Sequence, residues 1–112
     1  MRKSYSAFNA EYHRYVVLRF LSECPDGRAN DDITQTSLVD AGYEISHDDV
    51  LEAFRWLADQ RLVLLRELDP FLLATLTRRG GDVVAGRTPL AGVRKPLSGI
   101  IGVIAPLSGD NE

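Results

Sequence analysis

Residues 45–86 constrain the fold more than any other part of this chain. They read ISHDDVLEAFRWLADQRLVLLRELDPFLLATLTRRGGDVVAG. Apolar residues first recur at helical spacing, and two short apolar runs then follow on either side of Asp69-Pro70. A helical period followed by two strand-like runs with a tight connection predicts a helix, an antiparallel hairpin and a short closing helix, in that order.

The predicted helix of this segment begins after Ser46 and runs to about Gln60. Ser46 with Asp49 three residues later is a variant of the capping box, in which each residue satisfies the other's backbone N–H group. At 100° per residue the helix has an apolar inner face and a charged outer face, with Trp56 between them. The inner face holds Val50, Ala53, Phe54, Leu57 and Ala58. The outer face holds Asp48, Glu52, Arg55 and Asp59.

The predicted strands cover residues 62–68 and 71–76, and both contain enough leucine and valine to be half-buried. Thr77 is a good N-cap for a brief helix that runs to about Ala85. The Gly80-Gly81 pair is unfavourable inside a helix because glycine loses the most backbone entropy.

The N-terminal half predicts two further helices. The first runs from Ala7 or Asn9 to Ser22, and its later turns are apolar nearly all round. Such a helix is buried on several faces, either as a central core helix or at a dimer seam. After a turn at residues 25–27, Asn30 or Asp31 caps a second helix to about Ala41. Ile33, Leu38 and Ala41 form its expected inner face, and Gly42 ends it in the left-handed conformation.

Residues 87–112 differ in character from the rest. They contain three of the five prolines and repeat a Pro-Leu-Ala/Ser-Gly motif at residues 89–92, 96–99 and 106–109. Frequent prolines forbid a regular helix, yet residues 100–104 are too apolar for a free linker. We expect this Pro/Gly-rich segment to be an extended C-terminal arm that packs on its own domain or on a neighbour, after a domain formed by residues 1–86.

The predicted fold is therefore α+β and mainly helical. Three N-terminal helices, a two-stranded hairpin, a short fourth helix and an extended arm follow one another. The order of the second and third helices and the hairpin is that of a winged helix-turn-helix, in which the hairpin is the wing.

The residues from Leu38 to Gly86 also resemble the winged-helix domains of small bacterial regulators. The matching motifs are WLADQRLV at residues 56–63, which runs into the wing, and LTRRG at residues 76–80, which follows it. With GRTP at 86–89 and GVRKP at 92–96, the pattern resembles short uncharacterised proteins of Mu-like prophages, loosely grouped with ArsR-type regulators. The resemblance covers about residues 10–98 and implies a winged-helix protein of phage origin. The metal-sensing Cys and His clusters of ArsR-type sensors have no counterpart here.

Charge is unevenly distributed along the chain. Residues 23–69 carry twelve acidic and four basic side chains, a net charge of −8, whereas the segments on either side carry net charges of +3 and +2. Phosphate-binding surfaces need positive charge, so an acidic helix-turn-helix is the main sequence evidence against simple DNA binding.

Several other functions are not indicated. His13 and His47 are far apart, Cys24 has no partner cysteine, and the Gly80-Gly81 pair lacks the lysine of a phosphate loop. We therefore predict no catalytic residues, no metal, no cofactor, no small-molecule ligand and no enzyme. A single cysteine, no apolar run long enough to cross a membrane and no secretory signal favour a cytoplasmic protein.

Two functions remain open. The favoured hypothesis is that a homodimer binds double-stranded DNA as a transcriptional regulator, because winged helices commonly do so. The alternative is a protein–protein interaction module, with an assembly or adaptor role in the phage, that does not bind DNA. For the first hypothesis the expected DNA-binding residues are Arg55, Arg61, Arg66, Arg78 and Arg79.

Overall fold

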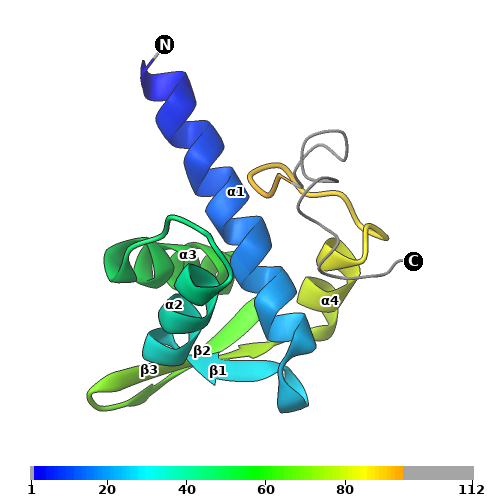
Figure 1. Ribbon diagram of the computed structural model, residues 1–112. Helices are drawn as coiled ribbons and strands as arrows, with labels where there is room; N and C mark the ends of the chain where they lie inside the picture. The colour runs from blue at the N-terminus through cyan, green and yellow to red at the C-terminus, as the bar shows by residue number, and fades with distance from the viewer. Residues whose placement is uncertain (1, 95–112) are drawn as a thin grey trace.

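The computed structural model describes residues 2–94, and the side chains of residues 9–94. These residues form an α+β fold that is mainly helical, with four α-helices and one three-stranded antiparallel sheet (Figure 1). The elements, in chain order, are α1 (Arg2–Glu23), the 3-10 turn η1 (Pro25–Gly27), β1 (Arg28–Asn30), α2 (Asp31–Asp40), α3 (His47–Asp59), β2 (Val63–Leu68), β3 (Phe71–Leu76) and α4 (Arg78–Val84).

The sheet has the strand order β1-β3-β2, so the predicted two-stranded hairpin was incomplete. β2 pairs with β3 along its whole length, from Val63 opposite Leu76 to Leu68 opposite Phe71. β1 pairs with the other side of β3, where Ala29 lies opposite Ala74. A strand of three residues with one buried side chain carries too little alternation to be found from sequence.

Helix α1 is the central helix of the fold. Figure 1 shows it running diagonally past the other elements, with its first turns projecting beyond them. Tyr15, Val16, Val17 and Leu18 are consecutive and all buried, together with Leu21. Four consecutive side chains point to all sides of a helix, so α1 is buried on several faces. It packs against α3, α4 and the sheet of its own chain, as expected for a central core helix. The helix also begins earlier than expected, at Arg2 instead of Ala7 or Asn9.

Helices α2, α3 and α4 all end in the same hydrogen-bonded motif. The residue after the C-cap has a positive φ, and the next N–H group bonds back to the carbonyl five residues earlier. Glycine occupies the positive-φ position after α2 (Gly42, φ 101°) and α4 (Gly86, φ 82°). After α3 the same position is Arg61, with φ 63°. An arginine therefore holds a backbone conformation that favours glycine.

The expected inner face of α2 was only partly right. Leu38 is buried as predicted, but Ile33 is 50% exposed and Ala41 is also exposed. The other buried residues of the helix are Asp31 and Thr34. Polar contacts determine this orientation, because the Thr34 hydroxyl donates to the carbonyl of Asn30 and the Asp31 carboxylate is bonded on two sides. The predicted N-cap at Asn30 is confirmed, since its side chain accepts a hydrogen bond from the Ile33 amide.

The first part of the C-terminal arm packs on its own domain. The carbonyl of Gly92 accepts a hydrogen bond from Arg14, whose guanidinium lies 4.2 Å from the centre of the Trp56 ring. Arg94 bonds to Glu11 through both its backbone N–H and its side chain. Trp56 is thus half-buried between α1 and the arm. The remainder of the arm, including the apolar run at residues 100–104, lies outside the described residues.

Candidate functional site

The outer stripe of α3 is exposed and acidic, as the sequence predicted. Asp48, Glu52 and Asp59 lie within about a third of the helix circumference of Arg55 at 100° per residue, and all four side chains are exposed. The capping box of Ser46 and Asp49 is also confirmed, by hydrogen bonds of 3.0 Å in each direction. A duplex approaching this stripe would meet three carboxylates around one arginine.

The structure brings three of the five predicted arginines together. Thr77, the N-cap of α4, donates its hydroxyl hydrogen to the carbonyls of Arg61 and Leu62, which ties the start of α4 to the end of α3. Arg79 donates from Nε to the carbonyl of Gln60 at 3.0 Å. Arg61, Arg78 and Arg79 are exposed at this junction, which we call the arginine corner. The acidic residue nearest to the arginine corner in the sequence is Asp59, two positions before Arg61.

The other two predicted residues lie away from the corner. Arg55 lies on the outer stripe of α3, and Arg66 lies on β2, whose register places it opposite Leu73. Both are exposed. Arg66 belongs to the side of the sheet that faces away from the helices, which we call the outer sheet face. Its members are Arg28, Asn30, Leu64, Arg66, Leu68, Phe71, Leu73 and Thr75.

The outer sheet face exposes large apolar side chains. Leu64 is 66% exposed, Leu68 43% and Phe71 40%. β2 is also an edge of the described sheet, since only β3 pairs with it there. Exposed apolar side chains on an open sheet edge are typical of a surface that pairs with another chain. Sequence reasoning missed this face because each strand contains leucines on both sides.

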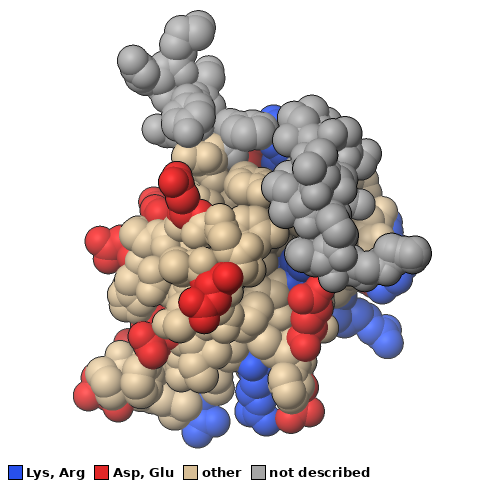
Figure 2. Space-filling view, viewed as in Figure 1, with Lys and Arg blue, Asp and Glu red and all other residues tan. Residues whose placement is uncertain are grey.

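The surface charges are polarised (Figure 2). Carboxylates lie mainly on the left of this view, over α2 and α3, with others at the right centre and lower right. The Lys and Arg side chains lie mainly along the lower and right sides, below the sheet and beside α4. Two arginines near the sheet and α4 are in ion pairs, because Arg28 lies 3.8 Å from Asp26 and Arg87 lies 3.0 Å from Asp82. The basic side of the molecule is therefore the region of the arginine corner and α4, and the acidic side is α3. The hairpin is not basic, since Glu67 and Asp69 accompany Arg66.

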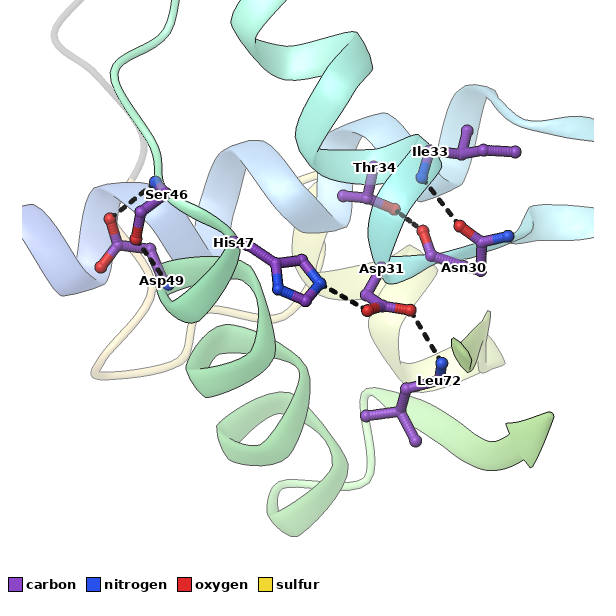
Figure 3. Close-up of polar contacts among 8 residues, drawn as sticks. All are labelled: Asn30, Asp31, Ile33, Thr34, Ser46, His47, Asp49 and Leu72. Atoms are coloured by element: carbon purple, nitrogen blue, oxygen red, sulfur yellow. Dashed lines mark hydrogen bonds and ion pairs between the residues drawn. The ribbon is translucent and has the colours of Figure 1, made fainter. Parts of the chain in front are cut away.

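A buried carboxylate connects the first turns of α2 and α3 to the hairpin (Figure 3). Asp31 accepts a hydrogen bond from the Leu72 amide at 2.8 Å, and its second oxygen lies 2.6 Å from His47 Nε2. Burial raises the pKa of Asp31, but the Leu72 amide and His47 outweigh it and hold the pKa below its ordinary value. The carboxylate thus stays ionised and fixes the angle between α2, α3 and the sheet.

This contact was not predicted from the sequence, in which Asp31 was only a candidate N-cap of the second helix. His47 lies at the surface, with about half of its side chain exposed. Within residues 2–94 no cluster of three or more His, Cys, Asp or Glu side chains could hold a metal ion. Nor does that part of the chain contain a helix long and apolar enough to cross a membrane.

These features define a small α+β protein with one acidic and one basic side. Over 86 residues, the chain is 43% identical to the uncharacterised protein gp26 of Escherichia phage Mu, and the match covers 77% of this chain and 88% of gp26. The chain therefore belongs to the gp26 family of phage proteins, which confirms the predicted resemblance to Mu-like phage proteins. No family model matches the chain. No solved structure matches it.

Proposed function

We propose that this protein is a winged helix-turn-helix protein that binds duplex DNA through the arginine corner, with Arg66 as the contact from its hairpin wing. The order of α2, α3 and the β2-β3 hairpin supports the winged-helix assignment, and β1 on the far side of β3 is compatible with it. In this proposal the basic side approaches the phosphates, and the acidic stripe of α3 does not lie deep in the major groove. The protein is non-enzymatic, and its role is gene regulation in the phage.

The conformation of Arg61 carries the proposal. The two other helices that end in this motif place glycine at the positive-φ position, whereas α3 places a long cation there. A non-glycine residue in the left-handed region costs on the order of 1–3 kcal/mol, and such residues cluster at functional sites. Arg61 with Arg78 and Arg79 offers three guanidinium groups at one junction, and guanidinium suits phosphate oxygens because of its fork of donors.

Titration into a fluorescent duplex of random sequence tests the proposal. We expect weak binding that Arg78→Ala with Arg79→Ala reduces, because each lost phosphate contact removes affinity and lowers the salt dependence. Arg87→Ala is the matched control, since Arg87 is exposed on the same side but paired with Asp82. Equal binding by both variants would remove the arginine corner from the interface. Unchanged affinity in Arg55→Ala would likewise remove Arg55.

A second function, protein interaction, is favoured by the outer sheet face. Leu64, Leu68 and Phe71 are apolar and exposed on this one face, with Leu68 opposite Phe71, which suits a protein partner better than a phosphate backbone. The simplest partner is a second copy of this chain, paired along the open edge of β2. Light scattering of the wild type and of Leu64→Glu tests this idea. A dimer that dissociates on this substitution supports it, and a wild-type monomer at high concentration contradicts it.

A further inference from the structure

An apolar groove lies between α1, α4 and the first part of the C-terminal arm. Its volume is about 480 Å³. Tyr15 contributes from α1, Val83 and Val84 from α4, and Leu90 and Val93 from the arm. The groove lining is therefore mostly aliphatic. A groove of this composition gains free energy when aliphatic side chains fill it.

The chain beyond the described residues starts at the rim of this groove. Val93 lines it, and the next residue, Arg94, is held to α1 by its backbone hydrogen bond and its ion pair with Glu11. Eighteen residues follow Arg94. The first five, residues 95–99, can span about 17 Å when extended, at 3.3–3.6 Å per residue. Residues 100–104 are therefore within reach of the groove.

The described part of the arm also shows how the chain can reverse. In the motif Pro89-Leu90-Ala91-Gly92, the Val93 amide bonds to the carbonyl of Leu90 and Gly92 has a φ of 97°, which closes a turn. The same motif recurs seven residues later as Pro96-Leu97-Ser98-Gly99. This second copy of the motif directly precedes Ile100-Ile101-Gly102-Val103-Ile104 in the sequence.

We infer that the groove between α1 and α4 binds residues 100–104 of the same chain. The segment from residue 96 to residue 109 carries no charged side chain, and its apolar run matches the aliphatic lining of the groove. The tether of Arg94 to Glu11 on α1 keeps this segment near the groove, and the inference predicts that Ile101 lies close to Val84. This inference is independent of DNA binding, so either can fail without the other.

Disulfide trapping in the full-length chain tests the inference. Val84→Cys and Ile101→Cys are combined in a Cys24→Ser background and exposed to oxygen with a copper–phenanthroline catalyst. We expect a monomeric disulfide, because the two thiols are held at bonding distance. The matched control pairs Val84→Cys with Ser108→Cys and should stay reduced. Equal trapping in both proteins would overturn the inference. A disulfide between two chains would also overturn it, since the occupant would then be another copy's arm.

A second measurement covers the case in which cysteines disturb the groove. Ile101→Asp in the otherwise unchanged chain should lower Tm by about 5 °C or more, because a carboxylate would have to leave the apolar groove. Ser108→Asp, close to the natural Asp110, should leave Tm unchanged. Equal Tm values for the wild type and Ile101→Asp would show that the groove does not hold this segment.

Discussion

Single side chains decide how the helices of this protein are oriented. Asp31 is 4% exposed and connects α2, α3 and β3. It lies in the first turn of α2, where Ile33 was expected to face the core. A buried carboxylate is stable only when its oxygens are bonded, and here both are. The acidic residues of this chain are therefore not all surface charges.

The pH dependence of stability should report Asp31. Its pKa is lowered in the folded chain, so its contribution is complete above the unfolded value of about 3.9 and is lost as the pH falls through the folded value. Asp31→Asn should cost about 1–3 kcal/mol at neutral pH and flatten the acid side of the profile. Urea unfolding between acid and neutral pH measures this. Asp32→Asn, its exposed neighbour, should keep the wild-type profile.

Two adjacent glycines of α4 should respond in opposite directions. A Cβ on Gly80 would collide with the carbonyl oxygen of Leu62 and lie 2.8 Å from Leu76, whereas one on Gly81 would meet only Leu76 at 3.9 Å. Gly80→Ala should therefore cost about 2–3 kcal/mol. Gly81→Ala should stabilise the helix by about 0.5–1 kcal/mol. Thermal unfolding of both variants decides the matter, and similar Tm changes would contradict this packing.

At the scale of elements, the end of α3 combines two roles. Its last hydrogen bonds, from Arg61 to Ala58 and from Leu62 to Leu57, are those of an ordinary helix terminus. The same turn directs the chain into β2 and presents the arginine corner. Stability and the proposed binding therefore place different demands on one residue, Arg61.

Arg61→Gly should separate these demands. Glycine adopts a φ near 63° without strain, so the variant should gain about 0.5–1 kcal/mol of stability, the strain relief being partly offset by glycine's entropy. Under the proposed function the same variant should bind duplex DNA more weakly. Urea unfolding and a binding titration on one protein sample measure both effects. A variant that is more stable and binds as well as the wild type would leave Arg61 without a binding role.

Long elements with a clear period could be predicted from sequence, and short or polar ones could not. α3 and the hairpin were predicted because the inner residues of α3 repeat at helical spacing and Asp69-Pro70 separates two apolar runs. β1 has three residues, and its pairing with β3 depends on contacts distant in sequence. The Asp31–His47 contact likewise joins two helices and has no local signal. The exposed arginines of the candidate site could be predicted from the sequence. The arrangement that places three of them in the arginine corner could not.

At the scale of the whole molecule, the N-terminal helix and the C-terminal arm are held together through Trp56. Gly92 lies so close to the indole that a Cβ there would be 2.5 Å from the ring. Gly92→Ala should therefore displace the arm, expose Trp56 and shift its fluorescence to longer wavelength, with a lower Tm. Gly86→Ala is a suitable comparison, because it also has positive φ but has open space around it. Unchanged Trp56 fluorescence in Gly92→Ala would contradict this packing.

The central claim is that the basic side of the molecule binds duplex DNA despite a net charge of −3. The most direct test is fluorescence anisotropy of the wild-type protein with a random-sequence duplex at low and at moderate salt. The account predicts affinity on the order of 1–100 µM that weakens as salt rises, because phosphate contacts release counterions. Absence of binding at low salt would contradict it. The acidic stripe of α3 would then dominate, and the outer sheet face would be the functional surface.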